Sequence, residues 1–415
     1  MRRGTAAWSR RALIALVLLG AAIIPGRASS QSTGPCVGSR CHRDGSVLWT
    51  SQLSGSWAAE DGVTGTVPGA GEAYAASASH LAVVGDGITV SGYQAATGHK
   101  SWQTTLTGLP PGSAIVGVRA WPSVVAVGVA VTGGTGSQSR LEIILSAATG
   151  KQIRAYPAAY YGGAAWANWQ DTVIIGRTAV TSYAIGTGRV AWRRQIGAVA
   201  QTWIVTGHYL YVGIASGGSL LSGPITALRR IDLTSGAERI IRLRAAEQGT
   251  LDGVVGQVAV LAGRDGLLGY SLQDGRLLWQ RAAGVLELID PSQDDAYIAT
   301  GSSLSALRLS TGKIVGRPAS SVAAGLYAVR DGIALGLDEG SHGDAWGFDM
   351  ATRKVVWSSV SLPWPHFFVD TSGLGGSAGQ ESSVTLLATC AAVGSSSGSG
   401  APAACQRPEL TAIKY

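Results

Sequence analysis

The chain has 415 residues, about twice the length of an ordinary domain, so it holds several domains or one repetitive architecture. Only 14% of the residues are charged and 59 are glycine, which excludes a charged disordered protein and a helical bundle and favours short strands joined by turns. The formal net charge of +7 suggests an acidic partner such as nucleic acid, until its distribution is considered.

Residues 1–30 predict an export signal or an N-terminal anchor. Five arginines and no acid flank an apolar run at 12–24, and small residues at 28–30 suit cleavage. The pair Arg10-Arg11 resembles a twin-arginine signal, with an ordinary signal as the alternative. The run is shorter than the roughly 20 residues that span a bilayer, which disfavours an uncleaved anchor. Without this segment, 27 basic and 25 acidic residues remain, so we expect no nucleic-acid partner.

Four cysteines follow the export signal, the first two of them within a linker predicted at 31–43. An even number in an exported chain predicts disulfides. The local pairing Cys36–Cys41 and Cys390–Cys405 is the simplest of three connectivities. The second bond would close the base of a Gly/Ser/Ala-rich loop, and both bonds would lie near the two ends of the folded region.

A repeat dominates the remainder of the chain. A full copy has an apolar strand, a turn of Asp/Ala-x-Thr-Gly type, and a Trp four residues after the last turn position. Copies with Trp are marked by Gly45 and Trp49, Gly98 and Trp102, Gly188 and Trp192, Gly275 and Trp279, and Arg353 and Trp357. Copies that keep only the turn are marked by Gly150, Gly236 and Gly312, with Arg154, Ile240 and Gly316 at the Trp position.

The spacing of the turns predicts the fold. Successive turns lie 37 to 53 residues apart, which suits the four-stranded blade of a β-propeller. Glycine supplies the positive φ of a tight turn, and Trp would fill the space between blades. For two intervals we expect strands near 201–205, 209–215 and 225–232, and near 284–289, 296–300 and 303–310.

The two ends of the chain complement each other. Residues 409–415 resemble the strands that precede other turns, but no Trp strand follows them. Residues 44–49 supply a turn and a Trp strand with no strand before them. We therefore expect an all-β, single eight-bladed propeller over 44–415, with seven blades as the alternative. The segment around 46–52 would be the outermost strand of the last blade, which protects strand edges.

The repeat resembles the pyrroloquinoline-quinone-type (quinoprotein-like) propeller repeat over nearly all of 44–415. That family includes quinone-dependent alcohol dehydrogenases and the propeller of the outer-membrane β-barrel assembly machinery. The dehydrogenases carry adjacent cysteines that stack on the quinone, and calcium ligands that include Asn. This chain has no adjacent cysteines and a single asparagine, Asn168, so the resemblance favours the non-enzymatic branch. Pyrroloquinoline quinone is therefore a less favoured cofactor, and none is expected.

Other catalytic patterns are weak. The six histidines form no pair at metal-ligand spacing, so no metal site is expected. Two Gly-x-Ser-x-Gly strings, at 375–379 and 394–398, lie in Gly/Ser-rich segments without a following helix pattern. Asp294-Asp295 predicts a solvated turn. The aromatic residues around Trp166 predict blade packing, with a stacking platform as the alternative.

We therefore expect an exported, non-catalytic propeller that serves as a binding scaffold outside the cell or at the cell envelope. Its partner would be an envelope or extracellular protein or a glycan, and it would touch a membrane only through an N-terminal anchor. The alternative is a quinone-dependent or other small-molecule oxidoreductase with its site over the central channel.

Overall fold

The computed structural model of the chain describes the elements of the folded region and the turns that join many of them. The described residues are 47–52, 57–58, 73–78, 80–132, 138–158, 164–168, 170–176, 178–196, 203–215, 224–263, 266–282, 285–290, 294–300, 303–316, 326–330, 333–337, 342–343, 345–349, 352, 354–358, 362–363, 384–390, 404–405 and 407–414. The predicted export signal and linker lie outside them, as do both Gly-x-Ser-x-Gly strings.

The described residues form antiparallel sheets and no helix. In each of the first three four-stranded sheets, strands that are consecutive in the sequence are neighbours in the sheet. They contain β3 (Ala73–Ala78), β4 (Leu81–Asp86), β5 (Thr89–Gln94) and β6 (Lys100–Thr105); β7 (Ala114–Ala120), β8 (Val124–Thr132), β9 (Gln138–Ser146) and β10 (Gln152–Ala158); and β11 (Ala164–Ala167), β12 (Asp171–Ile175), β13 (Ala179–Ala184) and β14 (Val190–Gln195).

A seven-stranded sheet comes next and has two halves that share one long strand. It contains β15 (Trp203–Thr206), β16 (Tyr209–Ala215), β17 (Pro224–Asp232), the shared β18 (Glu238–Val255), β19 (Val258–Gly263), β20 (Gly266–Ser271) and β21 (Leu277–Arg281). Two further four-stranded sheets contain β22 (Val285–Asp290), β23 (Asp295–Thr300), β24 (Ser303–Arg308) and β25 (Lys313–Gly316), and β26 (Leu326–Arg330), β27 (Ile333–Leu337), β29 (Ala345–Asp349) and β30 (Lys354–Ser358).

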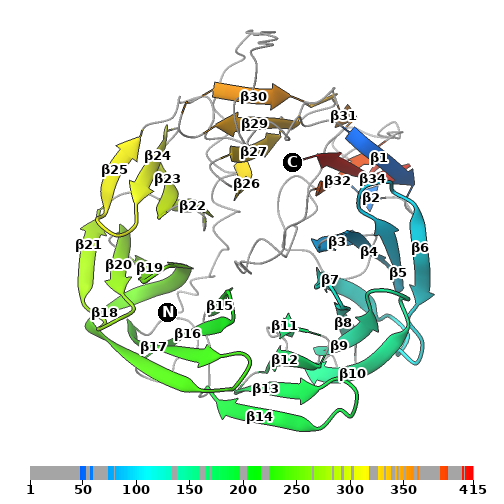
Figure 1. Cartoon of the computed structure of the whole chain (residues 1–415), viewed down its shortest axis with the longest axis horizontal. Helices are drawn as coiled ribbons and strands as arrows, with labels where there is room; N and C mark the ends of the chain where they lie inside the picture. Colours follow the sequence, from blue (N-terminus) through cyan, green and yellow to red (C-terminus); the bar gives the residue numbers. More distant parts are fainter. Residues whose placement is uncertain are drawn as a thin grey trace, which may run out of the picture.

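The remaining strands join distant parts of the sequence. β1 (Val47–Gln52), β34 (Pro408–Lys414) and β32 (Val384–Cys390) form a three-stranded sheet, and two short pairs are β2 (Trp57–Ala58) with β33 (Ala404–Cys405) and β28 (His342–Gly343) with β31 (Leu362–Pro363). Figure 1 shows the sheets arranged around a ring, with strands such as β7, β11 and β15 innermost and β6, β10 and β14 outermost. This is the architecture of a β-propeller, as the spacing of the turns predicts.

The strands predicted in two intervals match the structure closely. The first three correspond to β15, β16 and β17, and the second three to β22, β23 and β24, with bounds that differ by at most two residues. Alternating apolar residues and the Gly turns were therefore sufficient to place these strands.

The turns share one geometry. The φ of Gly98, Gly150, Gly188, Gly236, Gly275 and Gly312 lies between 67° and 71°. The backbone N–H of each donates to the carbonyl four residues earlier, at 2.6 to 2.9 Å. A side chain at such a φ is strained, so the turn explains the glycine that the repeat retains at these six positions.

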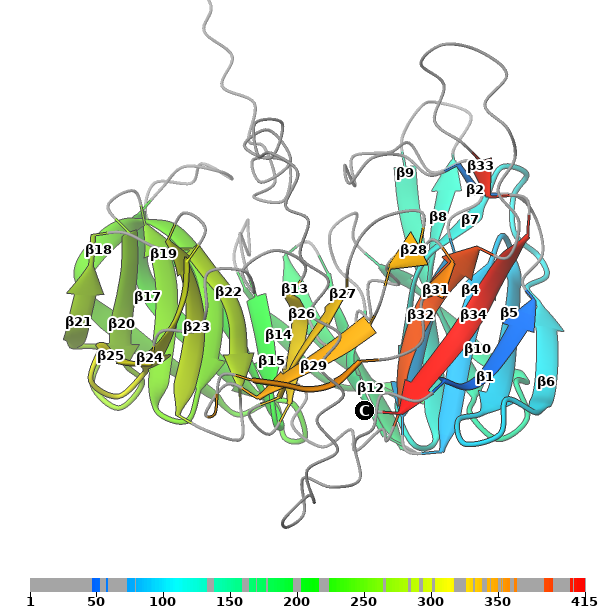
Figure 2. The same cartoon turned by 90° about the horizontal axis from the view of Figure 1, so that it is seen from above.

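β1 lies against the C-terminal strand. It pairs antiparallel with β34, with Thr50 opposite Thr411 and Gln52 opposite Glu409. β34 in turn pairs with β32, and Figure 2 shows the three strands side by side. The pairing between the two ends that the sequence predicts is therefore present.

The hydrophobic core is distributed between consecutive sheets. One cluster joins Val83 and Trp102 of the first sheet to Ile115 and Val127 of the second, and similar clusters occupy four later junctions. Another joins β1, β32 and β34 to β4 and β5. Because each sheet buries its faces only against its neighbours, stability depends on these junctions.

The part of the chain that the structure describes holds no helix with the length and hydropathy of a membrane span.

Candidate functional site

Several repeat Trp residues join their own sheet to the next. Trp102 lies between Gly92, its cross-strand partner on β5, and Gly150 in the turn of the second sheet. A Cβ atom at either glycine would collide with the indole ring. The indole Nε1 donates to the carbonyl of Ala147 at 2.8 Å. The Trp is therefore held on both faces and at its polar edge.

Two further copies repeat this arrangement. Trp49 packs on Gly98 and its Nε1 donates to the carbonyl of Ala95 at 2.7 Å. Trp279 packs between Gly269 and Gly312 and donates to the carbonyl of Leu309. In each case the acceptor lies three residues before the turn glycine, so the spacing of the repeat encodes the contact.

The remaining copies depart from this geometry. Trp192 packs on Gly236 and Trp357 on Gly347, but neither Nε1 has a hydrogen-bond partner among the described residues. Arg154 stands at the Trp position, so the sequence indicates that the aromatic contact is lost there. The structure instead places its guanidinium group against Gly188, where it takes the place of Trp.

At the next junction the backbone replaces a side chain. Ile240, at the Trp position, is 51% exposed. Gly275 lies so close to the carbonyl of Arg242 on β18 that a Cβ atom would collide with it. The shared strand β18 therefore closes this junction itself. No pattern in the sequence indicates that one strand serves two sheets.

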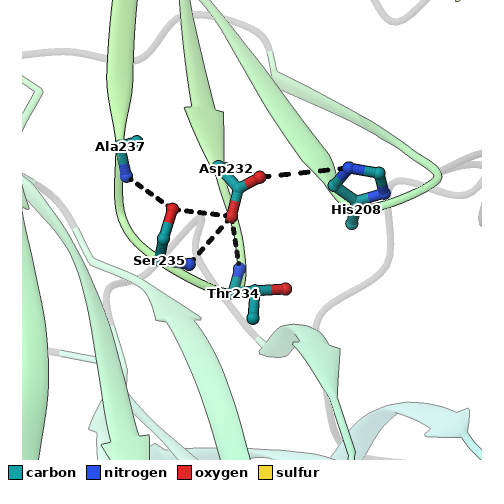
Figure 3. A network of polar contacts seen from close by, with 5 residues as sticks. All are labelled: His208, Asp232, Thr234, Ser235 and Ala237. Atoms are coloured by element: carbon teal, nitrogen blue, oxygen red, sulfur yellow. Dashed lines mark hydrogen bonds and ion pairs between the residues drawn. The ribbon is translucent and has the colours of Figure 1, made fainter.

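Asp232 organises a network of polar contacts in the turn after β17 (Figure 3). Its Oδ1 accepts from the N–H groups of Thr234 and Ser235, at 3.0 and 2.8 Å, and from Ser235 Oγ at 2.9 Å. The Nε2 of His208 lies 3.9 Å from Oδ2. Burial raises the pKa of Asp232, but the hydrogen bonds from Ser235 and Thr234 outweigh it, so the pKa lies below its usual value.

Ser, His and Asp are the residue types of a hydrolase triad, but their hydrogen bonds here do not have the pattern of a triad. In a triad the serine donates to the histidine, which removes its proton. Ser235 instead donates to Asp232, and Ala237 donates its N–H to Ser235 Oγ at 3.2 Å. The network therefore stabilises the turn and does not activate a nucleophile.

A second acidic turn differs from expectation. Asp294 accepts from the N–H of Ser310 at 3.2 Å, as a turn residue does. Asp295, expected in a solvated turn, is buried and accepts from Arg308 Nε at 2.5 Å. The prediction is wrong for Asp295 because it already belongs to β23, opposite Arg308 on β24.

Glu142 on β9 is a buried ionisable group with a strongly shifted pKa. Its side chain is buried between the second and third sheets, beside Gly128 on β8 and Tyr156 on β10 in one cross-strand row. Burial raises the pKa of Glu142 to about 7, against the opposing effects of Arg119, Arg140 and a hydrogen bond from the backbone of Ala164. A Cβ atom at Gly128 would lie 3.3 Å from the carboxylate, so this glycine makes room for it.

Arg119 is the partner of Glu142 and contacts three successive sheets. It lies on β7, it donates through an η nitrogen to the carbonyl of Ala164 on β11 at 2.6 Å, and its guanidinium lies 5.1 Å from the ring centre of Trp203 on β15. Burial lowers the pKa of Arg119, and Glu142 opposes that effect. The pair can hold a proton, and Arg119 ties the inner strands of three sheets together. The sequence does not indicate this arrangement, because Ala164 and Trp203 belong to two other sheets.

The other predicted site residues have varied outcomes. Trp166 packs against the cluster between the third and fourth sheets, and Asn168 Oδ1 caps its turn by accepting from the N–H groups of Gln170 and Asp171. No group of three or more potential metal ligands lies among the described residues. Cys36 and Cys41 lie outside the described residues. Cys390 ends β32 and Cys405 ends β33, and both disulfides stay predictions.

No protein-family model matches the sequence, and no curated protein matches it. Similar solved structures include BamB from Moraxella catarrhalis, with 16% identity and a TM-score of 0.37 over 65% of this chain and 79% of that one. Kluyveromyces lactis Hsv2 has 8% identity and a TM-score of 0.43 over 68% and 94% of the two chains. A eukaryotic initiation factor has 10% identity and a TM-score of 0.48 over 79% and 83%.

Proposed function

We propose that the protein is an exported β-propeller of eight blades that binds a partner protein or a glycan and carries out no catalysis. The blades would be β3–β6, β7–β10, β11–β14, β15–β18, β18–β21, β22–β25, β26 with β27, β29 and β30, and β32 with β34 and β1. In this count β18 serves two blades, and three described strands form the last blade.

The observation that carries the proposal is the way the sheets are joined. Trp49, Trp102 and Trp279 each pack on the turn glycine of the next sheet and donate to a carbonyl beside that turn. The polar groups of the turn at Asp232 are likewise satisfied internally. A ring built in this way is a rigid support whose loops and outer strands remain available for recognition.

The same contacts support our proposal that the two ends of the folded region close the ring. β1 pairs with the C-terminal strand β34, and its Trp49 packs on the first complete sheet. The disulfides Cys36–Cys41 and Cys390–Cys405 would stabilise the two segments that meet at this junction. We further propose that the repeat is of the pyrroloquinoline-quinone type without a resident quinone, and that residues 1–30 direct export to the cell envelope or beyond.

The test uses residues 31–415, the proposed exported form, immobilised and exposed to an envelope extract and to purified cell-wall glycans. We expect a stoichiometric partner that is retained by the folded ring and lost after unfolding. The same preparation is also assayed for oxidation of alcohols and sugars after addition of pyrroloquinoline quinone and Ca²⁺. Quinone-dependent oxidation would show that the protein is an enzyme and contradict the non-catalytic proposal. N-terminal sequencing of the exported protein tests the cleavage site.

A further inference from the structure

The outer strands of two consecutive sheets carry a local excess of arginine. β14 contains Arg193 and Arg194, and the first part of β18, residues 238–244, contains Arg239, Arg242 and Arg244. The only acid in these two segments is Glu238. Residues 31–415 as a whole have nearly balanced charge, so the excess is a property of this surface, which we call the arginine surface.

Protection of strand edges does not account for the excess. A charged residue on an edge strand disfavours pairing with other chains. The outer strands β6, β10, β21, β25 and β30 each carry a single Lys or Arg, and β1 carries none. β14 carries two and residues 238–244 carry three.

The charges of this surface are only partly compensated within the chain. Glu238 is paired with Arg229 at 3.3 Å, and Arg244 with Asp274 at 3.8 Å. Arg239 donates to the carbonyl of Gln273 and Arg194 to that of Gly236. The guanidinium groups of Arg193 and Arg242 are exposed and form no bond to any described residue.

Apolar side chains lie among these arginines. Val190 on β14 is 55% exposed and Ile240 on β18 is 51% exposed. Along β18 the exposed positions 240, 242 and 244 alternate with the buried Ile241 and Leu243, so one face of an extended strand points outwards. β14 is also the outermost strand of its sheet, with one edge unpaired in the described part of the chain. Residues 238–244 of β18 pair with β17, and on the other edge Arg244 donates its backbone N–H to the carbonyl of Gly275 at 3.0 Å.

We propose that the arginine surface binds an extended acidic segment of a partner protein, in which carboxylates alternate with apolar side chains. Side chains on one face of an extended peptide recur about every 7 Å, the spacing of residues 240, 242 and 244 along their strand. Carboxylates accept paired hydrogen bonds from guanidinium groups, and the unpaired edge of β14 offers backbone hydrogen bonds. The inference rests on the scaffold function proposed above and names its binding surface.

The test measures fluorescence anisotropy of a labelled peptide of alternating Glu and Val with residues 31–415, beside a Lys–Val peptide and a short DNA duplex. We expect the Glu–Val peptide to bind most tightly. The double variant Arg193→Glu and Arg242→Glu should weaken its binding about tenfold. The control Lys313→Glu and Lys354→Glu makes the same change of charge at exposed sites on other outer strands, and should weaken it less than about twofold.

Equal weakening by both double variants, equal binding of the Lys–Val peptide, or tighter binding of DNA would overturn the proposal. The milder Arg193→Gln and Arg242→Gln pair serves if charge reversal unfolds the protein, and should weaken binding about threefold. Failure here is distinct from failure of the scaffold function. If the wild type and the arginine variants retain an envelope partner equally, the scaffold function stands and only the binding role of the arginine surface is rejected.

Discussion

Substitution of a single turn glycine isolates the contribution of the junctions between sheets. Gly150 has a φ of 67° and lies against the ring of Trp102 and the hydroxyl of Thr104. Gly87 has a φ of 59°, and a Cβ atom there would meet nothing within 4 Å. Gly150→Ala and Gly87→Ala therefore share the backbone strain and differ in the collision with the neighbouring sheet.

The magnitudes follow from these two effects. A side chain in the left-handed region costs about 1–2 kcal/mol, which both variants incur. Overpacking a tight contact costs a further 1–3 kcal/mol or so, which only Gly150→Ala incurs. We expect a loss of unfolding free energy of about 1–2 kcal/mol for Gly87→Ala and about 2–5 kcal/mol for Gly150→Ala.

The assay is urea unfolding followed by circular dichroism and Trp fluorescence, with both variants measured beside the wild type. Adding Trp102→Ala to each variant supplies an internal check. The cost of Gly150→Ala should fall towards that of Gly87→Ala once the indole ring is gone, because neighbouring substitutions are not additive. Equal costs for the two glycine variants in the wild-type background would refute the role assigned to the junction.

Three further changes test the polar groups. Because the pKa of Glu142 is raised to about 7, its neutral form favours the folded state, and stability from this group is lost as pH rises from about 4.5 to 7. Glu142→Gln should therefore match the wild type near pH 4.5 and exceed it by about 3 kcal/mol near pH 8 in urea unfolding; parallel pH profiles would contradict this. Arg119→Met should alter the near-ultraviolet signal of Trp203, with Arg140→Met as the control, and equal spectra would exclude the contact. Asp232→Ala should cost about 1–2 kcal/mol by removing the turn acceptor, whereas His208→Ala should cost under 0.5 kcal/mol; the reverse order would show that the histidine dominates the network.

The repeat made much of the fold predictable from the sequence. The turn glycines have a conformation that only glycine adopts easily, and their spacing sets the length of a four-stranded unit. The pairing of β1 with β34 was predictable because each end lacks what the other supplies. These features are local in sequence, or are repeated often enough to be recognised.

What the sequence did not predict depends on contacts between sheets. Arg154 replaces a Trp at one junction, and the long strand β18 replaces a side chain at another. The pair of Glu142 and Arg119 joins residues of two strands and is completed by Ala164 and Trp203 on two further sheets. No spacing in the chain marks these contacts between sheets, because they form only when the sheets pack side by side.

The most direct test of the closed ring is complementation of residues 53–415 by a synthetic peptide of residues 44–52. The truncated chain lacks β1, so it should melt at a lower temperature than residues 31–415, and the peptide should bind and restore the difference. A peptide with Trp49→Ala should restore far less, because it loses the packing on Gly98 and the hydrogen bond to Ala95. Equal melting temperatures with and without β1, or equal rescue by both peptides, would contradict closure of the ring by the N-terminal strand.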